Sequence, residues 1–166
     1  PINRETQVGP LAKKEFVEII NSQIERSVDN GANVIFKIDT NHKTGYFINP
    51  IIISINSTNI PLFKEEVFGP VLCIYKFNNN NNILDLSNST EYGLGSSIWT
   101  KDKKIIRKFK KEIKSGALFI NGMTKSDPKL PFGGIKKSGY GRELSSFGLK
   151  EFVNIKTIVM NKKDYV

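Results

Sequence analysis

The chain has 166 residues, which is long enough for one domain with a hydrophobic core. Its residues are 39% hydrophobic and 25% charged, as in soluble globular proteins, and no apolar run is long enough to span a membrane. The single cysteine, Cys73, excludes an internal disulfide, and the single histidine, His42, leaves too few ligands for an ordinary zinc site.

The net charge of +9 allows two interpretations. Residues 101–114 hold eight basic and two acidic side chains on one predicted helix, and such charge is typical of proteins that bind nucleic acids or anionic surfaces. Aromatic residues that could stack on bases do not alternate with these charges. We therefore interpret the cluster as a solvated helix face and expect neither a nucleic acid nor a membrane as partner.

The first third of the chain predicts a helix followed by short strands. Gly9-Pro10 is typical of a helix start, and Asn30-Gly31 is typical of a helix end. Between them, apolar residues at helical spacing predict one packed face: Leu11, Phe16, Ile19, Ile20, Ile24 and Val28. Residues 32–36 form a strand candidate, and residues 46–55, interrupted by Asn49-Pro50, predict two short strands or an edge strand. His42 lies in a polar turn, where a solvated role is expected.

The middle of the chain alternates predicted strands and helices. The continuous apolar run at residues 71–75 predicts a strand buried on both faces, with Cys73 as an inert core residue. After a surface insertion of five asparagines at residues 78–82, residues 83–89 predict a short helix. Residues 95–100 and 117–120 predict buried strands on either side of a helix that Asp102 caps. This order predicts an α/β fold with a mostly parallel sheet flanked by helices.

A glycine-rich stretch at residues 131–143 holds four of the 13 glycines. Gly133-Gly134 would let the backbone turn sharply with positive φ, and Gly139 and Gly141 would allow a second turn. Large apolar residues within the stretch, such as Tyr140, indicate a shaped loop and not a linker. The dinucleotide-binding fingerprint fails here because leucine replaces its third glycine. A short helical turn at residues 143–148 and a closing strand at residues 152–160 complete the prediction.

Residues 130–152 closely resemble the C-terminal segment of NAD(P)-dependent aldehyde dehydrogenases. The run Glu65-Glu66-Val67-Phe68-Gly69-Pro70-Val71 resembles the cofactor motif of the same family. The resemblance extends from residue 9 to residue 157, and residues 121–132 and 151–156 are most similar to the succinate-semialdehyde branch. It implies that residues 1–149 are the C-terminal part of a catalytic domain and that residues 150–166 are an oligomerisation strand and tail, which joins the sheet of a neighbouring subunit in a homo-oligomer.

The resemblance also implies site residues for the cofactor, NAD or NADP. Glu66 would hold the hydroxyls of the nicotinamide ribose, because a carboxylate accepts two O–H bonds at once, and Phe68 would pack beside the nicotinamide ring. Without the resemblance, the two glutamates of segment 65–71 favour an exposed acidic loop, and the cofactor role rests on the resemblance. Arg142 is expected to pair with Glu143 or with the backbone.

Loop 121–134 corresponds to the substrate tunnel of the family. Phe132 would line the aldehyde site. Ser126 would help to bind the carboxylate of a semialdehyde, with Thr124 and Lys125 as neighbouring alternatives.

In the family's reaction a thiolate adds to the aldehyde carbon, that carbon then gives up its hydride to the nicotinamide, and water cleaves the thioester that results. The nucleophile lies in a Gly-Gln-x-Cys context, which Cys73 does not match. We therefore assign no catalytic residue to the chain, expect the nucleophile upstream of Pro1, and expect the chain alone to be inactive. The choice between NAD and NADP and the identity of the aldehyde stay open, and a cytoplasmic location is expected.

Three alternatives remain: a split gene product that needs a separate chain with the missing half, an inactive remnant retained for binding, and a basic nucleic-acid-binding module.

Overall fold

The computed structural model describes residues 2–40, 44–78 and 83–161, and the chain divides into two units, Pro1–Ile83 and Leu84–Val166. The division falls directly after the asparagine run, most of which lies outside the described residues, as does His42. Each unit is described by itself below. The predicted functional division between residues 149 and 150 stays a prediction.

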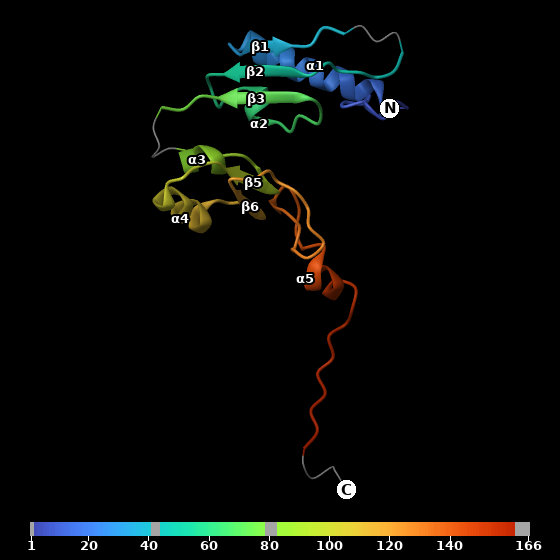
Figure 1. Cartoon of the computed structure of the whole chain (residues 1–166), viewed down its shortest axis with the longest axis vertical. Coiled ribbons are helices and arrows are strands. Elements are labelled where there is room, and N and C mark those ends of the chain that lie inside the picture. Colours follow the sequence, from blue (N-terminus) through green and yellow to red (C-terminus); the bar gives the residue numbers. More distant parts are fainter. Residues whose placement is uncertain (1, 41–43, 79–82, 162–166) are drawn as a thin grey trace. The chain divides into compact units, whose positions relative to one another are not determined.

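The first unit is a three-stranded sheet with two helices. Its elements are α1 (Lys14–Asp29), β1 (Asn33–Lys37), β2 (Ile51–Ile55), α2 (Pro61–Lys64) and β3 (Val71–Tyr75) (Figure 1). The strand order is β1-β2-β3, with β1 antiparallel and β3 parallel to the central strand β2. Strand β2, helix α2 and strand β3 therefore form a βαβ unit.

The core of this unit is organised by the alternation along β2. Ile51, Ile53 and Ile55 are buried and the two residues between them are half-buried, as the period of two along a strand requires. These three isoleucines pack with a cluster of buried residues from the segments around them: Ala32, Ile60 and Leu62. Burying each large aliphatic side chain stabilises the fold by roughly 1.5–3 kcal/mol.

Helix α1 differs from its prediction at its start and on its buried face. It begins at Lys14, four residues after Pro10, whereas its end at Asp29, followed by Asn30 and by Gly31 with φ of +91°, is confirmed. Its buried residues are Ile20, Gln23 and Ser27, while Phe16, Ile19 and Val28 are exposed. Polar side chains thus occupy the packed face, because they have specific partners there, which the next subsection describes.

The strand predictions for this unit were partly wrong. Only the part of residues 46–55 that follows Pro50 is a strand, and it is central and not an edge. Strand β3 was expected to be buried on both faces, but Leu72 and Ile74 are exposed, because only the face of β3 that carries Val71, Cys73 and Tyr75 packs against the core.

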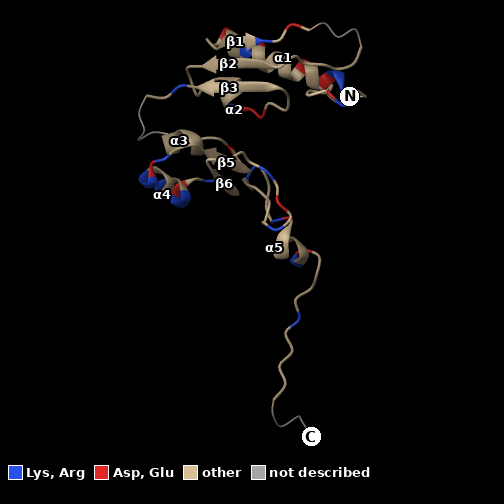
Figure 2. Cartoon of the chain, viewed as in Figure 1, with Lys and Arg blue, Asp and Glu red and all other residues tan. Residues whose placement is uncertain are grey.

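The second unit contains a second βαβ element. Strand β5 (Gly95–Ile98), helix α4 (Lys103–Glu112) and strand β6 (Ala117–Ile120) follow in order, and the two strands pair in parallel. Asp102 caps α4 as predicted, because its side chain accepts hydrogen bonds from the backbone N–H groups of Lys104 and Ile105. The lysines and arginine of α4 form the basic cluster predicted from the sequence (Figure 2). Both strands are less buried than predicted, since Ile98 is the single buried residue in the two.

Short elements complete this unit. They are α3 (Ile83–Asn88), β4 (Tyr92–Gly93), β7 (Ile135–Lys136), which pairs antiparallel with β4, and α5 (Ser145–Lys150). The α/β class is confirmed. A mostly parallel sheet is not confirmed, since the described strands form three small sheets with two parallel and two antiparallel pairings.

The predicted closing strand at residues 152–160 is also not confirmed. Residues 152–160 pair with none of the described strands, and the backbone continues past α5 without a ladder (Figure 1). A strand needs a neighbour for its N–H and C=O groups, so this segment is extended chain in the absence of a second edge.

Candidate functional site

Glu66 and Phe68 lie in the loop that connects α2 to β3, in the first unit. Backbone hydrogen bonds fix both ends of this loop: the N–H of Glu65 donates to the carbonyl of Pro61 (2.8 Å), and the N–H of Ile51 donates to the carbonyl of Pro70 (3.1 Å). Within the loop, the N–H of Gly69 donates to the carbonyl of Val67 at 3.0 Å, which closes a tight turn. The loop is therefore a shaped turn attached to the central strand.

The side chains of Glu66 and Phe68 are both accessible. Phe68 is 81% exposed, although it is a large aromatic residue, and the carboxylate of Glu66 has no hydrogen-bond partner among the described residues. The backbone beneath them packs tightly: a Cβ atom on Gly69 would lie 2.5 Å from Cδ1 of the buried Ile20. The turn thus rests closely on α1 and presents a free carboxylate and a free ring.

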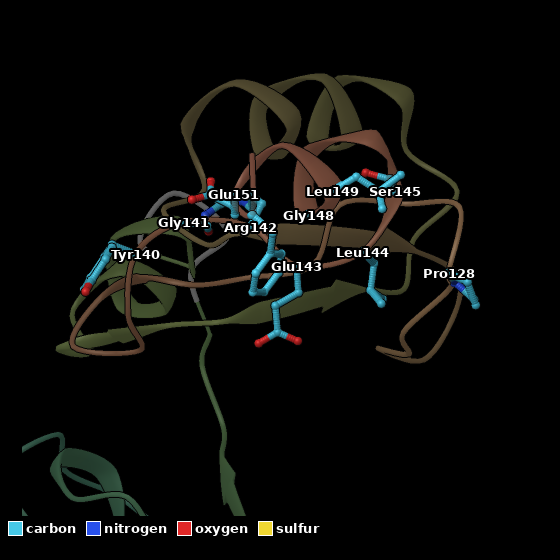
Figure 3. A pocket seen from close by; sticks show the side chains of 11 residues that line it. Pro128, Tyr140, Gly141, Arg142, Glu143, Leu144, Ser145, Gly148, Leu149 and Glu151 are labelled. Carbon is cyan, nitrogen blue, oxygen red and sulfur yellow. Dashed lines mark hydrogen bonds between the residues drawn. The ribbon is translucent and has the colours of Figure 1, made fainter. Parts of the chain in front are cut away.

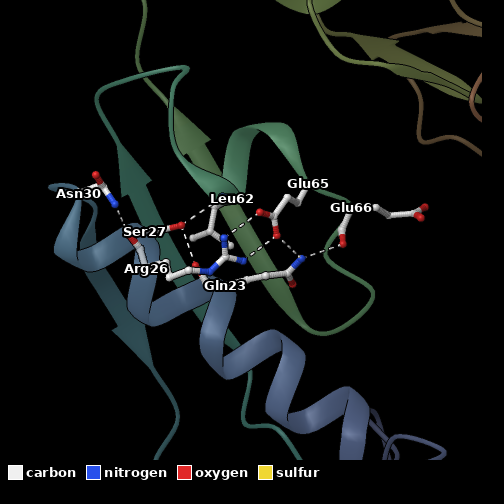
Figure 4. A network of polar contacts seen from close by, with 7 residues as sticks. All are labelled: Gln23, Arg26, Ser27, Asn30, Leu62, Glu65 and Glu66. Atoms are coloured by element: carbon white, nitrogen blue, oxygen red, sulfur yellow. Dashed lines mark hydrogen bonds and ion pairs between the residues drawn. The ribbon is translucent and has the colours of Figure 1, made fainter.

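Polar contacts with α1 hold the same turn (Figure 4). Arg26 binds Glu65 in a bidentate ion pair, with Nη1–Oε1 and Nη2–Oε2 distances of 2.9 Å each. The Nε2 group of Gln23 donates to Oε2 of Glu65 (3.0 Å) and to the carbonyl of Glu66 (3.2 Å). The hydrogen bonds from Arg26 and then Gln23 lower the pKa of Glu65 below its ordinary value, because they stabilise the carboxylate.

The burial of Ser27 has its own local cause. Its hydroxyl donates to the carbonyl of Gln23 (2.7 Å) and accepts from the N–H of Leu62 (3.1 Å), so it caps the first turn of α2 from α1. Sequence reasoning missed Gln23, Arg26 and Ser27. The available signal was the polar pair Gln23 and Ser27, four residues apart on the helix face that also carries Ile20 and Ile24.

The second candidate region, loop 121–134, lies in the second unit and begins at Asn121. This residue has a φ of 52°, which asparagine tolerates better than most residues. Its side chain accepts from the N–H of Thr100 (2.8 Å) and donates to the carbonyl of Thr100 (3.0 Å), so it ties the start of the loop to the end of β5. Ser126 is exposed, as are its neighbours Thr124 and Lys125. The hydroxyl groups of Ser126 and Thr124 and the ammonium group of Lys125 are therefore accessible from solvent.

Phe132 lies near the end of this loop and is half-buried. Two backbone hydrogen bonds join it to Glu143, from Phe132 N to Glu143 O (2.9 Å) and from Glu143 N to Phe132 O (2.6 Å). The backbone on either side of the ring is therefore fixed. Ser126 and Phe132 belong to one loop, while Glu66 and Phe68 belong to the other unit.

The glycine-rich stretch uses its glycines differently from the prediction. Gly139 and Gly141 have positive φ, of 122° and 75°, whereas Gly133 and Gly134 do not, so that part of the prediction was wrong. Gly133 lets its backbone lie close to the backbone of Gly141, since a Cβ atom at position 133 would lie 2.6 Å from the carbonyl oxygen of Gly141. Arg142 pairs with the backbone as predicted: its Nη1 donates to the carbonyls of Gly134 (3.0 Å) and Gly141 (2.6 Å).

A cavity of about 770 Å³ lies beside α5 in the same unit (Figure 3). Its lining comes from Pro128, from residues 140–145 and from Gly148, Leu149, Glu151 and Phe152, and includes neither Ser126 nor Phe132. The cavity therefore does not coincide with the predicted substrate residues.

Cys73 packs against the core of the first unit, as predicted. Burial raises the pKa of its thiol, which keeps the sulfur protonated and makes it a poor nucleophile. Within residues 2–40, 44–78 and 83–161, no group of three His, Cys, Asp or Glu side chains is arranged to hold a metal ion. The described helices are all too short or too polar to cross a lipid bilayer.

Comparison with known proteins identifies the family. The model of the aldehyde dehydrogenase family matches residues 1–158. Succinate-semialdehyde dehydrogenase [NADP(+)] 1 of Mycobacterium tuberculosis (strain H37Rv) is 42% identical over 158 residues, which are 95% of this chain and 35% of the relative. The corresponding enzyme of Mycobacterium leprae is 41% identical over the same length.

Solved structures agree with these sequence relatives. Succinic semialdehyde dehydrogenase from Streptococcus pyogenes, in complex with NADP+, is 36% identical, with a TM-score of 0.87 over 96% of this chain and 35% of that chain. The NAD+ complex of an aldehyde dehydrogenase from Bacillus cereus is 31% identical, with a TM-score of 0.88 over 97% of this chain and 33% of that chain. The chain thus spans about a third of the length of these relatives.

Proposed function

The chain belongs to the aldehyde dehydrogenase family, and we propose that it is the C-terminal part of an NAD(P)-dependent enzyme that oxidises succinate semialdehyde to the dicarboxylic acid. Its role is to supply the nicotinamide-ribose contact and part of the substrate site. The observation that carries this proposal is the turn at residues 65–70, which is anchored to α1 and β2 and yet presents Glu66 and Phe68 free of protein partners.

Glu66 and Phe68 fit a nicotinamide riboside. An ionised carboxylate accepts two hydroxyl hydrogen bonds, which matches the vicinal hydroxyls of a ribose, and an exposed aromatic ring covers one face or edge of a flat heterocycle. The cofactor would supply the hydride acceptor. The protein side chains orient it, and the relatives from Mycobacterium and Streptococcus carry NADP+ in their names.

Ser126 and Phe132 fit the other reactant. Phe132, held by its two backbone bonds to Glu143, would form a wall of the aldehyde site, and the exposed hydroxyl of Ser126 would donate to the distal carboxylate of the semialdehyde. Lys125 and Thr124 lie next to Ser126 and could share this carboxylate.

The catalytic thiol is proposed to come from outside these 166 residues, since Cys73 is half-buried against the core and burial raises the pKa of its thiol. It would belong to another segment of the same polypeptide or to a separate chain. The segment at residues 152–160 is proposed to pair with a second subunit, and the complete enzyme is proposed to be cytoplasmic.

A chimaera tests the function directly. The segment of the Mycobacterium tuberculosis relative that this chain matches is replaced by residues 1–158, and NADP+ and NAD+ reduction are measured with succinate semialdehyde. We expect turnover, and we expect Glu66→Gln to lower it by about tenfold or more, because a charged hydrogen bond to the ribose is lost. Glu18→Gln, which removes the exposed Lys14–Glu18 ion pair of α1, is the control. A folded chimaera that reduces neither cofactor would reject the proposal.

A further inference from the structure

We propose that Gln23 and Arg26 are positioning residues, which hold Glu65 and the backbone of Glu66 on α1 so that the Glu66 carboxylate points away from the protein toward its ligand. The identity of that ligand rests on the function proposed above, whereas the positioning itself rests on the contacts of the described residues.

The direction of the two glutamates follows from the backbone between them. Glu65 has extended dihedral angles, φ −94° and ψ 151°, and successive side chains of extended backbone point to opposite sides. When Arg26 binds the Glu65 carboxylate against α1, the side chain of Glu66 must point outward. Figure 4 shows this arrangement, with Glu65 turned toward Arg26 and Glu66 extending away from the helix.

Arg26 and Gln23 hold the turn through two different kinds of contact. The fork of Arg26 binds both oxygens of Glu65, which fixes the plane of that carboxylate as well as its position. Gln23 bridges the two residues, because one Nε2 group donates both to the Glu65 side chain and to the Glu66 carbonyl. The amide therefore couples the orientation of Glu65 to the peptide that carries Glu66.

The burial and hydrogen bonding of Gln23 indicate that its amide group is needed for the hydrogen bonds to Glu65 and Glu66 and not to fill space in the core. The residue is 5% exposed, and its Oε1 is buried without a partner among the described residues. The reversed amide is excluded, since it would place Oε1 against two oxygen acceptors. A leucine would fill the same space without burying an unpaired oxygen, so the two donated hydrogen bonds are what the amide adds.

Arg26 is the charged group that faces Glu65 from α1, and the neighbouring charged residues of the loop are Lys64, which bonds to Asn59, and Glu66. The pKa of Glu65 is lowered, so the ion pair is present at neutral pH and is lost as the pH falls through the folded-state pKa of Glu65. A positioning role thus predicts an acid-dependent loosening of the turn.

Hydrogen exchange on the intact chain tests the proposal. In Gln23→Leu and Arg26→Gln, the amide of Gly69, which closes the turn, should exchange about tenfold faster or more, while the amides of Ile53 and Ile55 in β2 keep their rates. Arg26→Lys keeps the charge but not the fork and should lie between these variants and the parent. Glu18→Gln removes the Lys14–Glu18 ion pair of the same helix and should change nothing at Gly69.

A pH profile separates positioning from a general structural role. In the parent chain, protection of the turn should fall on acidification together with the carbon-13 titration of the Glu65 carboxyl, and in Glu65→Gln this pH dependence should vanish. Equal rate changes in the turn and in β2, or unchanged exchange at Gly69 in both Arg26→Lys and Gln23→Leu, would overturn the proposal.

The chimaera distinguishes this proposal from the proposed function. If exchange responds as expected and Gln23→Leu and Glu66→Gln both keep full turnover, then the cofactor role of Glu66 is wrong and the positioning stands. If hydrogen exchange at Gly69 does not change in the Gln23 and Arg26 variants, the proposed positioning role is wrong, whatever turnover the chimaera shows.

Discussion

Phe132 and Glu143 exchange two backbone hydrogen bonds, and this pair closes the glycine-rich stretch into a loop that returns to its own start. Within the loop, Gly133 faces the carbonyl of Gly141. Gly116, the residue before β6, faces the carbonyl of Gly133, so a Cβ atom on Gly116 would overlap that oxygen. Three backbone segments therefore meet where only glycine leaves enough room.

Gly133→Ala should destabilise the second unit by about 1–3 kcal/mol, because the new methyl group would lie 2.6 Å from a backbone oxygen that cannot move alone. Urea unfolding followed by Trp99 fluorescence measures the effect, since Trp99 belongs to the same unit. Gly122→Ala, in the same unit, is the matched control, because the nearest atom to its added Cβ atom lies 4.0 Å away. Equal midpoints for the two variants would contradict the close packing at Gly133.

Ile53→Ala should destabilise the first unit by about 2–5 kcal/mol, since Ile53 is 0% exposed at the centre of the core and its truncation leaves a cavity. Leu72→Ala changes a side chain on the neighbouring strand that is 56% exposed, so it should lower the free energy of unfolding clearly less. Urea unfolding followed by far-ultraviolet circular dichroism compares the two. A larger loss of stability in Leu72→Ala than in Ile53→Ala would show that the Leu72 face of β3 is buried in solution.

The chain alone should show no aldehyde-dependent reduction of NAD+ or NADP+, because its thiol is a core residue. Burial raises the pKa of Cys73, so at pH 7–8 its thiolate fraction is below that of a free cysteine, and iodoacetamide should modify it more slowly than it modifies free cysteine. The chain unfolded in urea is the control and should react at the free rate. Turnover that Cys73→Ser abolishes would reverse this assignment.

Local signals in the sequence were sufficient for several elements. The cap at Asp102, the end of α1 at Asn30-Gly31 and the parallel strands around α4 were all predicted, because each depends on residues within a few positions or on one βαβ repeat. The burial of β3 was not predicted correctly, because it depends on what covers each face of the sheet and not on the strand's own apolar run, and only the face with Val71, Cys73 and Tyr75 packs against the core.

In the candidate site, too, local features were predicted from the sequence and long-range contacts were not. The turn with Glu66 and Phe68 could be found from its motif, but the residues that hold it could not. Arg26 lies 39 positions from Glu65, and Gln23 lies 43 positions from Glu66, so no periodic pattern connects them. The sequence pattern counted apolar residues on α1 and therefore assigned the packed face to Phe16 and Ile19, whereas long-range hydrogen bonds bring Gln23 and Ser27 inside.

The last prediction concerns the exposed segment after α5. Its large apolar side chains are mostly in water: Phe152 is 91%, Ile155 82% and Val159 80% exposed. Each such side chain forgoes roughly 1.5–3 kcal/mol of burial, and an extended backbone with free N–H and C=O groups favours pairing with the edge of another chain. We therefore expect the chain to self-associate through this segment.

Deleting residues 154–166 should make the chain more monomeric, because the deletion removes most of these side chains and the backbone groups that would pair. Sedimentation velocity of the intact and shortened chains at matched micromolar concentrations measures the difference, and circular dichroism verifies that the shortened chain folds. Ile155→Lys with Val159→Lys in the full-length chain is a second test, since charges on an edge oppose strand addition without changing the length. An intact chain that stays a soluble monomer across the micromolar range would show that this segment is not an association strand.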